Sequence, residues 1–341
     1  MKIQEICDVT LARLPNLLRT ILESGGCPIV LGPPGLGKSS AILQLGDAEG
    51  RPVIDQRAAN LSPSDLLGVL AVQEGKARFI QPCDILPTKP GGLLFWDEFT
   101  NAPPVIMKCL LQVVLDGRCG PHTLPPDTWQ VMAGNRLEDS CFIESLPASM
   151  WNRLVILRVK PDLDSWMKWA FGNKVGAQIT SWLTFKPGAL YDFIPDSWDG
   201  QSQFASPRAW DRLNRIMQTK GWASHSEDEK QSLIVGTVGS GAGIPFHGFL
   251  QLRANLPTFE EILKSPTKCP VPEEPSARTA VAAMIAEHLT PKNIGTAMKY
   301  AARLGVVMET FILKAAAAQN DALLVTPEVL EWIDKHPEVF A

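Results

Sequence analysis

A glycine-rich turn that ends in lysine and serine is the part of this sequence best suited to chemistry. Residues Gly32–Ser39 fit the phosphate-loop pattern G-x-x-x-x-G-K-[ST]. Glycines let the backbone fold tightly with its N–H groups directed at phosphate oxygens, and the helix that opens next adds its positive end. The lysine can reach the β- and γ-phosphates, and the serine hydroxyl can ligate Mg²⁺. The predicted phosphate-binding residues are Gly32, Pro33, Pro34, Gly35, Leu36, Gly37, Lys38, Ser39 and Ser40.

Two acidic residues follow a short apolar run further along the chain. The run Leu93–Trp96 reads as a strand buried on both faces, and Asp97 and Glu98 come directly after it. Ligands of open α/β sheets bind at the carboxyl ends of the strands. We therefore expect Asp97 to lie beside the phosphate loop and hold Mg²⁺, and Glu98 to polarise a water molecule.

An asparagine ends another predicted strand. The stretch Trp129–Asn135 is apolar until its last residue. Asn135 would thus be a third polar group at the same sheet edge, where its amide can hold a water molecule. An asparagine in an ordinary turn is the alternative reading.

Five predicted strands alternate with helices, which is typical of a doubly wound parallel sheet. The strands are expected at 28–31, 52–55, 91–98, 129–135 and 154–159, and helices before, between and after them at 11–24, 39–45, 103–116 and 161–170. Residues 69–90 read as an exposed insertion or hairpin, and residues 117–126 as a hairpin.

The strand signals fade beyond residue 173. Helices are expected at 207–218, 257–263, 279–288, 293–304 and 326–335, and the four prolines of 266–275 suggest an extended tether. The sequence therefore predicts an α/β nucleotide-binding domain over 1–172 and an α-helical lid domain with a helical extension over 173–341.

Composition narrows the possible partners. The chain of 341 residues carries a formal net charge of −4, so nothing in its balance favours nucleic acid or an acidic membrane. None of the seven cysteines forms a C-x-x-C pair, so the sequence does not support a zinc site. Their odd number and scattered positions favour reduced thiols. The first residues carry acid and no apolar core of a secretory signal, and no apolar run approaches membrane-span length. We expect a cytoplasmic protein.

Taken together, these motifs resemble the AAA+ ATPases. Gly32–Ser39 is similar to their Walker A motif, and Leu93–Glu98 is similar to their Walker B motif. Asn135 stands where that superfamily keeps its sensor 1 residue, Arg153 where it keeps an arginine finger, and Arg208 where it keeps sensor 2.

The spacing from residues 62–68 to the helix at 103 resembles the MoxR-type branch more narrowly. The resemblance covers roughly residues 10–255, with one departure: Leu154 stands where such chains often have Phe. Residues 69–82 and 117–127 fall where that branch has inserted loops, which often face a ring pore or a partner. Phe79 and His122 are the visible candidates for such contacts, although a single aromatic residue on a loop more often packs against its own hairpin.

The resemblance implies Mg²⁺-dependent hydrolysis of ATP in a homo-oligomer, either a six-membered ring or a helical filament. Lys38 and the loop would bind phosphates, Ser39 and Asp97 would hold Mg²⁺, Glu98 would activate the attacking water and Asn135 would place it. Arg153 would act on the neighbouring subunit's ATP, and Arg208 would report the nucleotide state to the lid. The family further suggests remodelling of a client protein, such as one with a von Willebrand A domain.

Other interpretations stay open. Arg153 and Arg208 could each form a local surface ion pair, and Arg136 is given no role. The chain could be an assembly protein whose hydrolysis only resets a ring or filament, or a nucleic-acid-linked motor of the same superfamily. The acidic balance and the lack of a basic, aromatic-interleaved stripe weigh against the motor.

Overall fold

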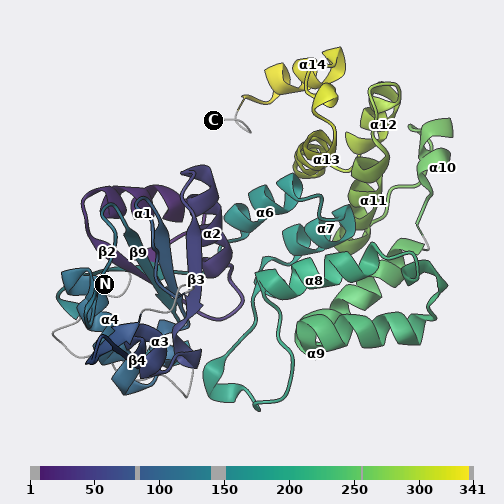
Figure 1. Cartoon of the computed structure of the whole chain (residues 1–341). Coiled ribbons are helices and arrows are strands. Elements are labelled where there is room, and N and C mark those ends of the chain that lie inside the picture. The colour runs from purple at the N-terminus through teal and green to yellow at the C-terminus, as the bar shows by residue number, and fades with distance from the viewer. Residues whose placement is uncertain (1–7, 81–84, 140–150, 255, 338–341) are drawn as a thin grey trace. The chain divides into compact units, whose positions relative to one another are not determined.

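The computed structural model describes residues 8–80, 85–139, 151–254 and 256–337 (Figure 1). The chain divides into two compact units, each described here by itself. The first consists of Met1–Asp162 with Ile194–Ser197, and the second of Leu163–Phe193 with Trp198–Ala341. The second unit begins ten residues before the predicted lid domain, which would begin at residue 173, because helix α6, Leu163–Gly172, groups with the second unit.

A parallel sheet of six strands forms the centre of the first unit, in the order β1-β10-β2-β9-β6-β3. The strands are β1 Asp8–Val9, β2 Cys27–Leu31, β3 Val53–Arg57, β6 Leu93–Asp97, β9 Trp129–Gly134 and β10 Leu154–Val159. The five predicted strands are confirmed, and the predicted α/β class with them. Strand β1 is not among the predicted strands, and it contributes only two residues at the side of the sheet.

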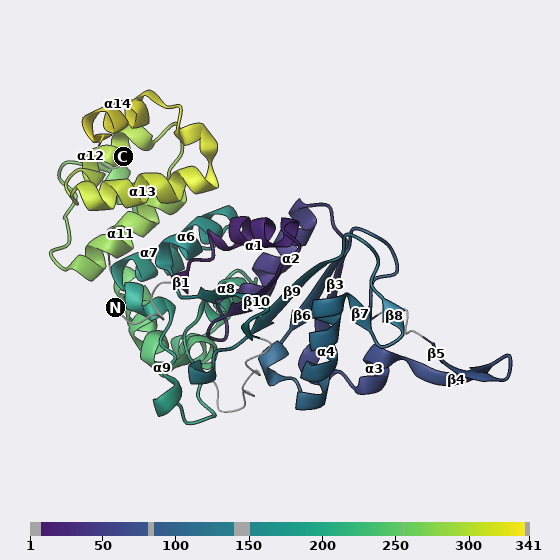
Figure 2. The same cartoon turned by 90° about the vertical axis from the view of Figure 1, so that its left-hand side faces the viewer.

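Helices cover both faces of this sheet (Figure 2). The helical segments of the first unit are α1 Leu14–Glu23, α2 Lys38–Ala48, η2 Ala58–Asn60, α3 Pro63–Leu67, η3 Phe99–Asn101, α4 Pro104–Asp116, η4 Leu137–Asp139 and η6 Pro195–Ser197. The core beneath α4 joins Ile106 and Leu110 of that helix to Ile29, Trp96 and Met132 of three neighbouring strands. This packing fixes the strand ends that carry the candidate site.

Two antiparallel hairpins extend the first unit, and they confirm the two predicted insertions. They are β4 Val69–Gln73 with β5 Lys76–Ile80, and β7 Arg118–Cys119 with β8 His122–Thr123. The side chain of His122 packs inward, because its Nε2 lies 3.0 Å from the carbonyl oxygen of Leu67. Phe79 instead stays 45% exposed.

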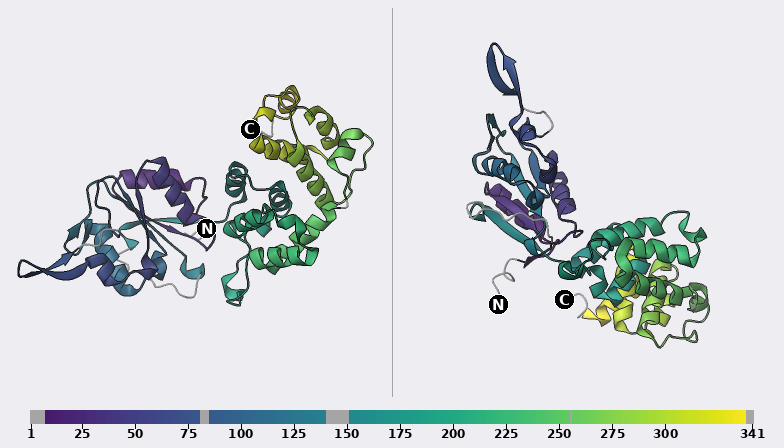
Figure 3. Two further views of the ribbon diagram at one scale, coloured as in Figure 1. Left: turned by 45° about the vertical axis from the view of Figure 1, so that its right-hand side comes forward. Right: turned by 90° about the horizontal axis from the view of Figure 1, so that it is seen from below.

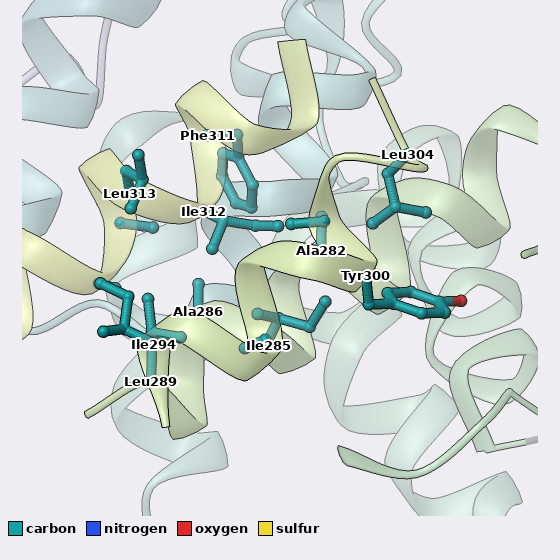
Figure 4. Close-up of a cluster of buried hydrophobic side chains, with 14 of the residues drawn as sticks. Ala282, Ile285, Ala286, Leu289, Ile294, Tyr300, Leu304, Phe311, Ile312 and Leu313 are labelled. Carbon is teal, nitrogen blue, oxygen red and sulfur yellow. The ribbon is translucent and has the colours of Figure 1, made fainter. Parts of the chain in front are cut away.

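The regular elements in the described residues of the second unit are all helices. Its segments are α6 Leu163–Gly172, α7 Ala177–Phe185, η5 Pro187–Leu190, α8 Pro207–Met217, η7 Trp222–Ser224, α9 Glu227–Ala254, α10 Phe259–Lys264, α11 Pro275–His288, α12 Ile294–Ala301, α13 Val306–Gln319, η8 Asp321–Leu323 and α14 Pro327–Lys335. Figure 4 shows one of its cores, where Ile285 of α11, Ile294 of α12 and Ile312 of α13 point toward one another. A second core gathers Trp166, Trp182 and Trp210, so these tryptophans pack helices together.

Residues 266–275, predicted as an extended tether, are irregular but held at several points. Tyr300 Oη donates to the carbonyl oxygen of Pro270 at 2.7 Å, and Arg303 Nη1 donates to those of Pro266 and Cys269 at 2.9 and 2.8 Å. The Cys269 side chain is also buried. The segment is thus a pinned connection rather than a free linker.

One helix in the described ranges, Glu227–Leu252, meets the length and composition of a membrane span, with a hydropathy of 1.3. Half of that window is buried inside the structure, and the backbone at Gly239 is not helical. Core helices pass the same test, so this is weak support for a membrane span.

Candidate functional site

Four adjacent strands bring the candidate residues to one edge of the sheet. The phosphate loop follows β2, and its neighbour β9 ends immediately before Asn135. The next strand, β6, ends at Asp97, and β3 beside it ends at Arg57. Strands β2 and β3 follow one another along the chain, but β9 and β6 lie between them in the sheet. The phosphate loop after β2 therefore lies at a crossover of the chain, and α/β sheets bind ligands at such points.

Lys38 connects the phosphate loop to Asn135. Its ammonium Nζ donates to the carbonyl oxygens of Gly32 at 2.6 Å and Pro33 at 2.9 Å, and to Asn135 Oδ1 at 3.2 Å. The residue is only 8% exposed. The positive charge is therefore held at the mouth of the loop among neutral oxygens, which is a position from which it can exchange partners with an incoming anion.

The loop backbone adopts the turn that its glycines predict. Gly37 has a φ of 104° and directly precedes α2, which begins at Lys38. Few side chains tolerate that conformation, so a glycine is needed there. The N–H groups of the first turn of α2 point toward the loop, where an anion can accept hydrogen bonds from them.

Ser39 and Asp97 lie together, as the sequence predicts for a magnesium site. Ser39 Oγ donates to Asp97 Oδ2 at 2.8 Å, and Asp97 Oδ1 accepts from the backbone N–H of Glu98 at 2.9 Å. A hydroxyl and a carboxylate are the oxygen ligands that Mg²⁺ prefers. These two residues therefore fit the ion.

Glu98 occupies an unusual backbone conformation, with a φ of 53° and a ψ of 31°. Such a left-handed conformation is uncommon for a residue with a side chain and is found at functional sites. Its carboxylate Oε1 lies 3.3 Å from Arg57 Nη1, and both side chains are about half exposed, at 46% and 61%. Glu98 is thus turned toward solvent at the site and is accessible to a water molecule.

Arg57 is a site residue that the sequence analysis missed, and Asp55 is another. Arg57 pairs in register with Asp97, and Asp55 lies two residues earlier on the same face of β3. Burial and the nearby Asp97 carboxylate raise the pKa of Asp55. Asp55 could have been found in the sequence, because it stands at the end of a predicted strand. Arg57 could not, because the acidic residue that it contacts depends on the order of the strands.

Thr100 supports Asn135 from the turn after β6. Its Oγ1 accepts from the Asn135 backbone N–H at 3.1 Å. Arg136, by contrast, is engaged with its own turn: its Nε donates to Asp139 Oδ2 at 2.6 Å, and this ion pair raises the pKa of Arg136. The absence of a predicted role for Arg136 agrees with this local pairing.

Arg153 lies at the amino ends of the strands, whereas the phosphate loop lies at their carboxyl ends. It is exposed and directly precedes β10, whereas the loop follows β2, and these two neighbouring strands are parallel. The structure therefore does not bring Arg153 to the site of its own subunit. Arg208 belongs to the second unit, on the first turn of α8, where Ser206 Oγ caps the helix by accepting from the backbone N–H of Ala209 at 3.2 Å.

Replacement of Gly32 by alanine tests how closely the loop packs on the sheet. A Cβ at Gly32 would lie 2.6 Å from the carbonyl oxygen of Val159, a backbone atom that cannot move aside easily. We expect Gly32→Ala to lower the free energy of unfolding by about 1–3 kcal/mol, measured by urea denaturation. Gly92→Ala is the matched control in the same unit, since its Cβ meets only ordinary contacts at 3.5 Å and beyond. Equal stability of the two variants would contradict the expected clash.

Comparisons with known proteins give a distant likeness only. No protein family and no curated protein sequence matches the chain. Among solved structures, the RuvB Holliday junction branch migration motor of Thermotoga maritima is 14% identical over 75% of this chain and 76% of its own, with a TM-score of 0.41. NtrX of Brucella abortus in complex with ADP is 17% identical over 86% of this chain and 69% of its own, with a TM-score of 0.38. At these values, neither structure supports a conclusion about what this chain binds.

Proposed function

We propose that this protein is a Mg²⁺-dependent ATPase that converts ATP and water to ADP and phosphate. The observation that supports it most is that two hydrogen-bonded pairs, Lys38 with Asn135 and Ser39 with Asp97, lie at the carboxyl ends of adjacent strands. A lysine at the mouth of a glycine-rich loop and a serine–aspartate pair beside it are what a triphosphate requires. The motif resemblance to AAA+ ATPases, and to their MoxR-type branch, agrees with this proposal.

Each residue has a separate task in this mechanism. The ammonium of Lys38 leaves its carbonyl partners and binds β- and γ-phosphate oxygens, together with the N–H groups of residues 35–40. Ser39 and Asp97 would hold Mg²⁺, which when bound would supply positive charge to neutralise the phosphates. Glu98 accepts a proton from the attacking water. Asn135, once Lys38 turns to the phosphate, is able to orient that water with its amide.

The charge that develops on the γ-phosphate must also be neutralised, and Arg57, the arginine that ends β3, faces Glu98. We assign that task to Arg153 of an adjacent subunit, which requires head-to-tail packing into a closed ring or a helical filament. Arg208 would couple the helical unit to the nucleotide. Remodelling of a client protein by this assembly follows from the motif resemblance alone.

Removal of the lysine charge tests the proposal directly. We expect Lys38→Ala to weaken binding of a fluorescent ATP analogue by about a hundredfold or more and to abolish ATP turnover, because a buried cation that meets the phosphates is lost. Lys108→Ala, an exposed lysine on α4, is the control and should bind and hydrolyse ATP normally. Chelation of Mg²⁺ should stop turnover by the wild-type protein. ATP turnover by Lys38→Ala at the wild-type rate would refute the proposed function.

A further inference from the structure

The hairpin formed by β4 and β5 projects from the first unit beyond the sheet (Figures 2 and 3). Its strands pair antiparallel from Val69↔Ile80 to Gln73↔Lys76. The connecting residues Glu74 and Gly75 both have positive φ, at 52° and 73°, which is the turn that matches strand twist in a two-residue loop. The hairpin is therefore a regular element rather than a disordered insertion.

One face of this hairpin is entirely apolar and uncovered. Register places Leu70 opposite Phe79 and Val72 opposite Ala77, so these four side chains share a face. Leu70, Val72 and Phe79 are 59%, 76% and 45% exposed. An isolated two-stranded hairpin is marginally stable in water, and exposed apolar clusters of this kind mark interaction sites.

The opposite face is basic near the tip. Lys76 and Arg78 alternate with the apolar residues of β5, and both are exposed. The acidic residue of the hairpin, Glu74, lies in the turn rather than on a strand. In the described part of the chain, β4 and β5 form a sheet of two strands, so β5 pairs along one edge with β4. Its other edge presents backbone N–H and C=O groups to an incoming strand.

The base of the hairpin is fixed to the rest of the unit. Cys119 Sγ donates to the carbonyl oxygen of Leu66 at 3.1 Å, and His122 Nε2 lies 3.0 Å from that of Leu67. Both contacts come from the second hairpin, β7–β8, and join it to the end of α3 just before β4 begins. The apolar face is thereby presented on an anchored arm.

We propose that the free edge of β5 binds an extended segment of a partner protein in which apolar and acidic residues alternate. The segment adds as a third strand through backbone hydrogen bonds. Its apolar side chains extend the face of Ala77 and Phe79, and its carboxylates lie opposite Lys76 and Arg78. The charge of the hairpin selects the acidic segment, and this binding does not require ATP hydrolysis.

The probe is a fluorescein-labelled nine-residue peptide of alternating valine and glutamate, titrated into the full-length protein and followed by anisotropy. We expect saturable binding that weakens as salt is raised, and hydrogen exchange at residues 76–80 should slow in the complex. A valine–lysine peptide should bind about tenfold more weakly, because like charges then face each other. A peptide methylated on every amide nitrogen should not bind, since it keeps the side chains but loses the backbone donors.

Charge reversal on the hairpin provides the matched comparison. The double variant Lys76→Glu with Arg78→Glu should reverse the preference and bind the valine–lysine peptide better. The double variant Lys89→Glu with Lys108→Glu changes the net charge equally at exposed sites elsewhere and should behave as wild type. Phe79→Ser should weaken both peptides. ATP turnover should be unchanged in these variants.

Three results would overturn the proposal. The first is no binding of the valine–glutamate peptide, or binding that survives charge reversal or amide methylation. The second is binding of the hairpin to phosphatidylglycerol vesicles without any binding of the peptide, which would make the hairpin a membrane contact. The third is concentration-dependent self-association that Phe79→Ser abolishes while the peptide does not bind, which would make the occupant a second copy of this chain.

Discussion

Replacing Glu98 with glutamine should leave ATP binding intact and lower turnover by about 10²–10⁴-fold, because the variant loses the group that accepts a proton from water. Glutamine keeps the length of the side chain and an oxygen that can face Arg57, so the loop and its contacts should persist. Single-turnover hydrolysis of radiolabelled ATP measures the chemical step, and a fluorescent analogue measures affinity. The pattern expected is a lost rate with an unchanged dissociation constant.

Glu138→Gln is a stringent control for that experiment. Glu138 is also paired with an arginine, at 2.8 Å from Arg136 Nη1, and its side chain is 51% exposed, close to the 46% of Glu98. It has the same chemistry but lies outside the proposed catalytic group, so its replacement should leave turnover unchanged. Wild-type turnover by Glu98→Gln would remove Glu98 from the mechanism, and equal losses in both variants would point to a general electrostatic effect.

The sheet and most of the candidate site could be predicted because local patterns carry them. Continuous apolar runs predict buried parallel strands, and polar residues that end such runs must gather at one edge. Lys38, Ser39, Asp97 and Asn135 are linked in the structure as that reasoning requires. Lys38 and Ser39 follow from the phosphate-loop pattern, and Asp97 and Asn135 follow from the ends of predicted strands, so their prediction does not require the strand order.

The helices missed were those without a polar stripe or with unfavourable residues. In α13, Ile312, Ala315 and Ala316 are buried along with neighbours on other sides, so the helical period is weak. In α9, glycines and Pro245 argue against a helix, yet packing of Phe246 and Phe249 around Trp182 compensates. Tertiary burial decided these elements, and local propensity could not reveal it.

Long-range pairings were also beyond the sequence. The contact of Arg57 with Glu98 requires that β3 lie beside β6, although 41 positions separate the two residues. In the same way, no local pattern shows that the β7–β8 hairpin holds the base of β4 through His122. Such contacts follow from the sheet order, which alternating strands and helices leave undetermined.

Replacing Arg153 with alanine should lower turnover by about 10³-fold or more while ATP binding is kept, because the arginine would neutralise charge on the γ-phosphate of the adjacent subunit. Its position supports action between subunits, since it lies at the amino end of β10, away from its own loop. Arg215→Ala is the control: Arg215 forms an exposed pair with Asp211 at 2.8 Å on α8, and such pairs contribute little. Its removal should not affect turnover.

Mixing two inactive variants separates action between subunits from a structural role. In Glu98→Gln subunits the nucleotide is still bound and Arg153 is intact, whereas Arg153→Ala subunits have an intact loop and Glu98. If assembly is random in an equal mixture, about a quarter of the sites combine an intact Glu98 with a neighbour's Arg153. Turnover should therefore reappear on mixing, although each variant alone is inactive. Mixtures that stay inactive, despite co-assembly shown by cross-linking, would place Arg153 outside the reaction and leave it as a surface residue of the sheet's far edge.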